Sequence, residues 1–271
     1  MDVLKDLNDT ARGKLLNLLN EWWIKKEVPE DILTAKVFSL YKKGNASAQE
    51  NYRPLSLLSS LYKVFAAILK ERIEEGLRLS INNTQFGFMK SKSTSQALHI
   101  VRRVISLFER SGKVGHMLFL DWSKAFDKVV QSKLIEILIE KGVDKHLIQL
   151  VGALYKKTTF VVEANDVISS KKMQSTGIRQ GCPLSPFLFI VLLDGIMEKV
   201  YLDPRCPNAF HIPCLRNYEV LYADDTTLMS TNNTELQTFL HLLEEYAEAY
   251  GLVLNQKKCV HIALNSAQRI R

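Results

Sequence analysis

The sequence is poor in cysteine and contains no long apolar run. Its four cysteines, among 271 residues, include no pair at the spacing of a metal-binding knuckle, which favours a reduced, intracellular setting over a disulfide-stabilised secreted scaffold. Cys206, His211 and Cys214 fall within nine residues, but no fourth ligand stands near them, so no zinc site is expected. The longest apolar run, Phe187 to Leu193, is far too short to cross a bilayer, and the N-terminus lacks a signal-peptide pattern. No membrane partner is therefore expected, and nothing in the pattern chooses between nucleus and cytoplasm.

Acidic residues are too few to neutralise the basic residues in the first half of the chain, whereas the second half has no net charge. Residues 1–120 contain 19 Lys and Arg against 12 Asp and Glu, whereas residues 121–271 contain 17 of each. Lys and Arg neutralise phosphates, so a basic lobe joined to a neutral one suits a polyanion such as a nucleic acid. A modest basic excess is also common in soluble proteins, so charge alone leaves both interpretations open.

Hydrophobic periodicity and turn residues predict a mixed helix-and-strand chain of the α+β class, without internal repeats or linkers. Asp144 and Thr234 are expected to cap the helices that follow them. Asn165 and Asp166 are expected at the turn of a hairpin. The expected helices cover residues 3–24, the stretch after Pro54, and residues 95–110, 129–142, 145–156, 183–200 and 234–251. The expected strands cover residues 33–45, 117–121, 158–173, 220–228 and 252–259.

Two adjacent carboxylates lie inside a run of strand-forming residues, VLYADDTTL, at Asp224 and Asp225. The pattern predicts a short hairpin with the two acids in its turn. Adjacent like charges raise each other's pKa and are costly to desolvate unless a cation lies against them. A metal ion is the obvious cation, and an ordinary surface Asp-Asp turn is the alternative.

A third carboxylate, Asp121, follows the apolar run MLFL, which is typical of a central strand that opens on a site at its C-terminal end. Asp121 and Asp224 are 103 positions apart, so only the fold can bring them together. If their strands are neighbours in one sheet, the carboxylates can hold two divalent ions for phosphoryl transfer. Mg²⁺ suits such a site best, because it is a hard ion held by carboxylates and substrate phosphates.

Six segments resemble, in order and spacing, the motifs of reverse transcriptases. The first and third are most similar to those of non-LTR (LINE-type) retrotransposons, and the resemblance covers about residues 30–260. The segments are NYRPLSLLS, QFGFMKSKSTSQAL, FLDWSKAFDKV, GIRQGCPLSPFLF, YADD and YGLVLNQKK.

The resemblance implies a right-hand polymerase fold with fingers and a palm, in which an antiparallel sheet is backed by helices. Residues 1–116 would form the fingers-like basic lobe with the N-terminal helices, and residues 117–271 the palm, with fingers segments returning within residues 155–180. The stretch after Gly251 leaves no room for a thumb, so the chain is expected to be a fragment of a longer polyprotein or the remnant of an element.

The resemblance also assigns the site. Asp121, Asp224 and Asp225 would be the catalytic metal ligands for two Mg²⁺ ions, with Mn²⁺ as a substitute. Phe126 would pack under the sugar and exclude a 2′-hydroxyl, although it also suits a core aromatic position. Its place disfavours a viral RNA-dependent RNA polymerase, whose pocket should be more open.

Further residues would contact the nucleotide or the nucleic acid. Met89 stands where many relatives have an arginine, which puts triphosphate binding by this segment in doubt. Lys257 is next to Lys258 and competes with it for the implied contact with the triphosphate. Asp127 is expected to cap the helix that follows it. Nucleotide contacts are implied for Gln180, Gly181, Arg53, Lys90 and Lys258, and nucleic-acid contacts for Lys92 and Tyr222.

The sequence therefore predicts an RNA-directed DNA polymerase that transfers a deoxynucleotide from dNTP to a primer 3′-hydroxyl. Its partners would be an RNA template, a DNA primer and dNTP. The alternative is a truncated, catalytically silent remnant that binds nucleic acid. The complete set of carboxylates favours the first, and the missing thumb favours the second.

Overall fold

The computed structural model describes residues 6–77, 80–164, 167–207 and 219–265. The chain divides into two compact units, each made of two separate stretches of sequence. The first unit consists of Met1–Arg78 with Leu138–Ser185, and the second consists of Leu79–Ile137 with Pro186–Arg271. Residues 155–180 thus fold with the N-terminal stretch, and the division into fingers and palm at residues 116/117 stays a prediction.

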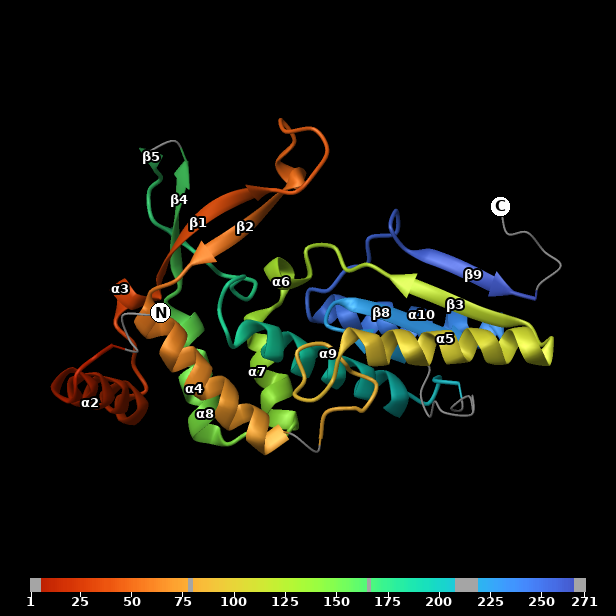
Figure 1. Ribbon diagram of the computed structural model, residues 1–271, viewed down its shortest axis with the longest axis horizontal. Coiled ribbons are helices and arrows are strands. Elements are labelled where there is room, and N and C mark those ends of the chain that lie inside the picture. The colour runs from red at the N-terminus through yellow and green to blue at the C-terminus, as the bar shows by residue number, and fades with distance from the viewer. Residues whose placement is uncertain (1–5, 78–79, 165–166, 208–218, 266–271) are drawn as a thin grey trace. The chain divides into compact units, whose positions relative to one another are not determined.

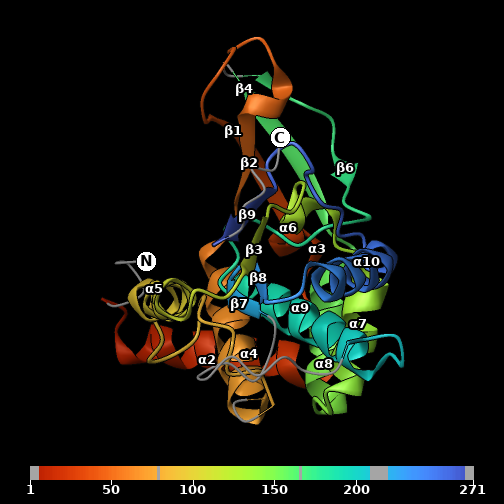
Figure 2. The same ribbon diagram turned by 90° about the vertical axis from the view of Figure 1, so that its right-hand side faces the viewer.

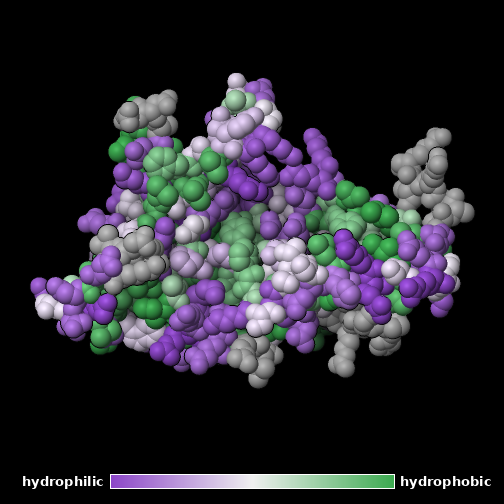
Figure 3. Space-filling model, viewed as in Figure 1, coloured by the Kyte–Doolittle hydropathy of each residue, from purple (hydrophilic) through white to green (hydrophobic). Residues whose placement is uncertain are grey.

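The first unit contains a sheet in the strand order β2-β1-β4-β5, with β6 also paired to β4 (Figure 1). β1 pairs antiparallel with β2 and parallel with β4. Figure 3 shows a hydrophobic patch over this sheet, and Leu40, Leu55 and Leu57 of β1 and β2 are exposed. The strands are β1 (Thr34–Tyr41), β2 (Tyr52–Leu57), β4 (Thr159–Ala164), β5 (Val167–Ile168) and β6 (Lys172–Met173). The helices are α2 (Asp9–Lys25), α3 (Glu30–Leu33), the 3₁₀ turn η1 (Gln49–Asn51), α4 (Ser60–Leu77) and α8 (Lys145–Lys156).

The helix expected directly after Pro54 is wrong at its start. Pro54 lies inside strand β2, opposite Ser39 of β1, and α4 begins only at Ser60. β2 is the last strand of its sheet, where a residue without an N–H is tolerated. The hydroxyl of Ser59 accepts a hydrogen bond from the N–H of Tyr62 at 3.1 Å, which gives α4 its cap. An N-terminal serine cap before the apolar stripe was thus the better signal.

The Asp144 cap is confirmed, and the hairpin after α8 has paired strands on both sides of its turn. The Asp144 carboxylate accepts hydrogen bonds from the N–H groups of His146 and Leu147. β4 and β5 pair antiparallel. Residues 165 and 166, which were expected at the turn, lie outside the described residues.

The second unit is built on an antiparallel sheet in the strand order β7-β8-β3-β9 (Figure 1). Figure 2 shows α5 on one side of this sheet and α9 and α10 on the other. The strands are β3 (Gly115–Leu120), β7 (Glu219–Tyr222), β8 (Asp225–Ser230) and β9 (Val260–Leu264). The helices are α5 (Thr94–Ser111), α6 (Ala125–Lys128), α7 (Gln131–Glu140), which runs past the division, α9 (Ser185–Leu202) and α10 (Asn233–Ala249).

Burial explains both faces of this sheet. On the α5 side, a core cluster joins the helix to the strands; its members are Phe86, Ala97, Val104, Phe108, Met117, Val220 and Met229. On the other side, residues 187–193 of α9 are all fully buried, as expected for a helix that is apolar all round. None of the helices within the described stretches is long and apolar enough to span a membrane.

Two local expectations for the C-terminal part are wrong. The cap of α10 is Asn232, whose side chain accepts from the N–H groups of Thr234 and Glu235, so Thr234 lies inside the first turn. The strand expected over residues 252–259 is interrupted by a turn in which Lys258 N–H donates to the carbonyl of Asn255, and β9 begins at Val260. In both cases a short polar side chain or turn satisfies backbone groups one or two residues away from the expected place.

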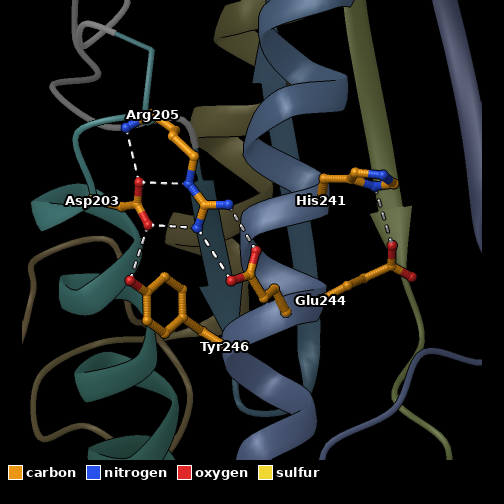
Figure 4. A network of polar contacts seen from close by, with 6 residues as sticks. Asp203, Arg205, His241, Glu244 and Tyr246 are labelled. Carbon is orange, nitrogen blue, oxygen red and sulfur yellow. Dashed lines mark hydrogen bonds and ion pairs between the residues drawn. The ribbon is translucent and has the colours of Figure 1, made fainter.

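An ion network attaches the segment after α9 to α10 (Figure 4). The guanidinium of Arg205 donates to both carboxylate oxygens of Asp203 and to the carboxylate of Glu245, and the Tyr246 hydroxyl donates to Asp203. These hydrogen bonds, those from Arg205 first, hold the pKa of Asp203 well below its usual range. Arg205 therefore has a structural role in the second unit.

Candidate active site

The strands that carry Asp121 and Asp225 are neighbours in one sheet, as predicted, and they bring the carboxylates to one edge of it. β3 and β8 are adjacent and antiparallel, and Leu120 at the end of β3 pairs with Thr226 of β8. The next residue of β3's chain, Asp121, is therefore level with Asp225, the first residue of β8. Asp224 precedes Asp225 in the turn that joins β7 to β8. Residues more than one hundred positions apart thus meet at the end of one strand pair.

The turn that carries Asp224 is tight. Tyr222 pairs with Asp225, so Ala223 and Asp224 form a two-residue hairpin loop. Of the two acids predicted for the turn, Asp224 lies in it, whereas Asp225 is the first residue of β8. Ala223 has a positive φ of 57°, in the left-handed region, which costs a residue with a Cβ about 1–2 kcal/mol. Such strain persists only where surrounding contacts hold the backbone, and it is common at functional sites.

The electrostatics of this edge favour a cation. Burial first, and then the carboxylates of Asp224 and Asp121, raise the pKa of Asp225. Lys258 supplies one positive charge, with its Nζ 3.2 Å from Oδ2 of Asp121. Within the described stretches, no three acidic, histidine or cysteine side chains are arranged as a ready-made metal site. The donor set nevertheless fits a hard divalent ion, because it offers carboxylate oxygens whose mutual repulsion such an ion would relieve.

The segment before β9 is attached directly to Asp121. The N–H of Asn255 donates to the carbonyl of Asp121 at 2.7 Å, and the turn that follows carries Lys258 back to the Asp121 carboxylate. Trp122 adds a second support, since its Nε1–H donates to Oγ1 of Thr226 on β8 at 3.2 Å. Trp122 was not predicted to have a role, because its partner on β8 is 104 positions away in the sequence.

Phe126 lies in the short helix α6 and packs in the core. Its ring stacks on that of Phe189 from α9, with centroids 5.0 Å apart and planes inclined by 16°, and it is half-buried. This contact demonstrates the core role, and the predicted contact with the sugar stays a prediction. The cap expected of Asp127 is wrong, because Asp127 lies within α6 and α7 begins at Gln131, after Val130.

The predicted phosphate and nucleic-acid contacts before α5 and on β7 lie in different environments. Lys92 donates from Nζ to the carbonyls of Asn83 and Gln85, at 3.0 and 2.8 Å, and burial lowers its pKa. It therefore supports the loop, and its contact with nucleic acid stays a prediction. Lys90 is exposed, and Tyr222 is half-buried beside the α5-side core cluster.

The predicted nucleotide-binding residues of the first unit lie on and beside β2. The carbonyl of Gln180 accepts from the N–H of Ser56 at 2.9 Å. Gly181 has a φ of 112°, and a Cβ on it would lie 2.6 Å from the carbonyl oxygen of Ser56. Arg53 is exposed on the same strand, opposite Leu40. A glycine is thus required where this loop crosses β2.

Arg179, next to Gln180, was not predicted to have a role. It is buried, donates from Nη2 to the carbonyls of Leu33 and Thr159, and lies 5.4 Å from the centroid of the Tyr62 ring. It therefore joins the starts of β1 and β4 to the loop that carries Gln180. Its place beside a Gln-Gly pair was a signal, but burial could not be read from the sequence.

Of the three residues considered for a zinc site, only Cys206 lies among the described residues. Cys206 is half-buried, and burial is the main cause that raises the pKa of its thiol. His211 and Cys214 lie outside the described residues. The absence of a zinc site stays a prediction.

Comparisons with known proteins match nearly the whole chain. A family model described as reverse transcriptase (RNA-dependent DNA polymerase) matches residues 40–268. The retrovirus-related Pol polyprotein from the type-1 retrotransposable element R2 of Popillia japonica is 27% identical over 245 residues, which cover 89% of this chain and 34% of the relative. The RNA-directed DNA polymerase from the mobile element jockey of Drosophila funebris is 28% identical over 249 residues, covering 87% and 26%. The chain thus spans about a third or less of the length of these relatives.

Solved structures show the same fold. Apo telomerase from Candida tropicalis, truncated from its C-terminal domain, has a TM-score of 0.63 at 16% identity. The matched region covers 94% of this chain and 56% of the telomerase chain. Telomerase from Candida tropicalis in complex with a fragment of telomeric RNA has the same TM-score, covering 93% and 45%. The predicted right-hand fold, with helices and an antiparallel sheet, is confirmed at the level of architecture.

Proposed function

The chain belongs to the reverse transcriptase (RNA-dependent DNA polymerase) family, and its relatives over most of its length are reverse transcriptases of non-LTR retrotransposons. We propose that it transfers deoxynucleotidyl units from dNTP to the 3′-hydroxyl of a DNA primer paired with an RNA template. The observation that carries this proposal is the meeting of Asp121 with Asp225 across β3 and β8, with Asp224 in the adjoining turn.

The carboxylates of Asp121, Asp224 and Asp225 would hold two Mg²⁺ ions, for which Mn²⁺ can substitute. Bound divalent ions would lower the pKa of the attacking hydroxyl and offset charge on the leaving phosphate. The carboxylates come from two strand ends of one sheet, so their backbone positions are fixed before substrate arrives. Lys258, whose Nζ lies 3.2 Å from the Asp121 carboxylate, would donate a proton to the leaving pyrophosphate.

Other residues would select and hold the nucleotide. Phe126 would limit the space beside the sugar 2′ position, and its stacking on Phe189 fixes the ring in place. Gln180 and Gly181 would line the nucleotide pocket, where the lack of a Cβ lets the backbone come close. Arg53 and Lys90, both exposed, would contact phosphates.

The proposed partners are an RNA template, a DNA primer and dNTP. The solved telomerase with bound telomeric RNA supports an RNA partner for this fold. Lys92 and Tyr222 belong to the proposed nucleic-acid contacts, and an intracellular location completes the proposal.

Primer extension tests the activity directly. Poly(rA)/oligo(dT), dTTP and Mg²⁺ would be supplied to the chain, to Asp224→Asn, and to Asp9→Asn as a control for loss of an exposed carboxylate far along the sequence from the site. We expect extension by the parent chain and by Asp9→Asn, and none by Asp224→Asn, with binding of the duplex intact in all three. Equal activity in Asp224→Asn would refute the site.

RNA binding with steep salt dependence and no extension by any of the three proteins, or by a version extended through a thumb, would instead identify a silent remnant. A version extended C-terminally through a thumb would be assayed in parallel. Extension by that version alone would show that these residues contain the chemistry but do not hold the duplex.

A further inference from the structure

A segment before α5 covers the outer edge of β7. The N–H of Leu221 on β7 donates to the carbonyl of Thr84 at 2.9 Å, and the N–H of Phe86 donates to the carbonyl of Leu221 at 2.8 Å. Gln85 forms a parallel bridge with Leu221. Residues 84–87, which we call the edge segment, therefore act as one more short strand on the sheet that carries the aspartates.

The side chain of Gln85 connects this edge segment to the turn of the acidic hairpin. Gln85 is fully buried, and its Oε1 accepts hydrogen bonds from the N–H of Gly87 at 2.8 Å and from the N–H of Ala223 at 3.1 Å. Nε2 of Gln85 is buried without a hydrogen-bond partner in the described part of the chain. The contacts of the amide are thus made by its oxygen, which satisfies two backbone donors.

The backbones of the edge segment and the turn are in direct contact. A Cβ on Gly87 would lie 2.2 Å from the backbone nitrogen of Ala223. Ala223 is the residue whose left-handed φ makes the two-residue loop, and Asp224 follows it immediately. A bulkier residue at 87 would therefore push against the residue that sets the position of Asp224.

The edge segment is itself held firmly at its start. The N–H of Asn82 donates to the carboxylate of Asp194, and the hydroxyl of Thr84 donates to the carboxylate of Glu219, each at 2.9 Å. Asp194 and Glu219 are both fully buried. Gln85 therefore extends from a fixed support rather than from a loose loop.

We propose that Gln85 is a positioning residue for Asp224: its amide oxygen, together with the close approach at Gly87, holds Ala223 in its left-handed conformation and so fixes the Asp224 carboxylate. This role rests on the proposed function, in which Asp224 binds metal. Gln85 touches neither substrate nor metal. It acts through the backbone of the turn.

The test uses the full chain with Gln85→Met, which keeps the length of the side chain and removes the acceptor. Thr84→Val is the matched control, because it removes a partly buried hydrogen bond from the same edge segment at the other end of β7. Gln85→Glu is the conservative variant, because it keeps an oxygen at the acceptor position. Three readouts would be used: amide hydrogen exchange at Ala223 after ¹⁵N-alanine labelling, Mn²⁺ affinity by electron paramagnetic resonance, and the kinetics of primer extension, expressed as kcat and KM for dTTP.

We expect faster exchange at Ala223 and weaker Mn²⁺ binding in Gln85→Met, with kcat lowered about 10–100-fold, since a misplacement of about 1 Å has an effect of this order. KM for dTTP should change little. Thr84→Val should leave all three readouts near their parent values even if its melting temperature falls. Gln85→Glu should restore the protection of Ala223.

Parent-like Ala223 exchange and Mn²⁺ affinity in a folded Gln85→Met would overturn the positioning role. Equal losses in Thr84→Val would also overturn it, because they would show general destabilisation. If Gln85→Met does not fold, Gly87→Ala provides the second perturbation of the same turn and is judged by the same readouts. If the parent chain shows no extension, the proposed activity of this chain fails, while exchange and Mn²⁺ affinity still decide the role of Gln85.

Discussion

The crossing of the Gln180 loop over β2 gives a prediction that separates backbone strain from steric collision. Gly181→Ala would introduce a Cβ 2.6 Å from the carbonyl oxygen of Ser56, at a residue whose φ is 112°. Gly142→Ala is the matched variant in the same unit, because Gly142 has a φ of 73° and nothing within 4 Å of its Cβ position. The first variant adds strain and a clash, and the second adds strain alone.

The magnitudes follow from the geometry. At Gly142, left-handed strain of about 1–2 kcal/mol is partly offset by the lower entropy of an unfolded chain with alanine, leaving a loss of about 1 kcal/mol. At Gly181, strain of about 1–3 kcal/mol is joined by the collision with a strand carbonyl. The nearby hydrogen bond from Ser56 N–H to Gln180 would be disturbed as well, at about 0.5–1.5 kcal/mol. We expect Gly181→Ala to lose about 2–4 kcal/mol of unfolding free energy.

Urea unfolding followed by circular dichroism measures the difference. The unfolding free energy of both variants and of the parent should fall with urea concentration at the same slope. The urea concentration at the midpoint should be highest for the parent, lower for Gly142→Ala and lowest for Gly181→Ala. If the unfolding free energies of the two variants agree within about 0.5 kcal/mol, the loop does not approach Ser56 closely in solution, and Gly181 is not required there.

Three further predictions concern the carboxylate edge. Asp225→Asn should stabilise the metal-free fold at pH 7 by up to about 1 kcal/mol. The pKa of the Asp225 carboxyl is raised above 3.8 in the folded protein, so the parent protein loses stability as the pH rises from 3.8 through the raised pKa. A lower melting temperature of Asp225→Asn in calorimetry at pH 7 would contradict this. Lys258→Met should strengthen Mn²⁺ binding by about 1.5–5-fold, since an exposed ion pair worth about 0.2–1 kcal/mol no longer competes at Asp121, and weaker binding in titrations would count against it. Phe126→Ala should raise the use of ribonucleotides relative to deoxynucleotides, and it should lower the unfolding free energy by about 2 kcal/mol because the stacking on Phe189 is lost. An unchanged nucleotide preference in competitive extension would show that Phe126 does not exclude the 2′-hydroxyl.

Local pattern predicted most elements of this chain, and it failed where another part of the chain or a neighbouring side chain bonds the backbone. The apolar helix α9, the Asp144 cap and the acidic hairpin follow from composition and periodicity within a few residues. The errors at Pro54, Thr234 and residues 252–259 arose where a competing partner was nearby: strand β1, Asn232 and the carbonyl of Asp121. Each partner satisfied backbone groups that the pattern alone left undecided.

The sequence by itself determined the chemistry at hand: which carboxylates, lysines and glycines are present, their order, and their resemblance to reverse transcriptases. Only the tertiary structure decided that Asp121 is level with Asp225, because strand pairing joins residues far apart in the chain. It alone also decided that Gln85 reaches Ala223 and that Gly181 crosses Ser56. Such contacts depend on buried backbone groups finding partners, and the choice of partner is made by packing rather than by the residues on either side.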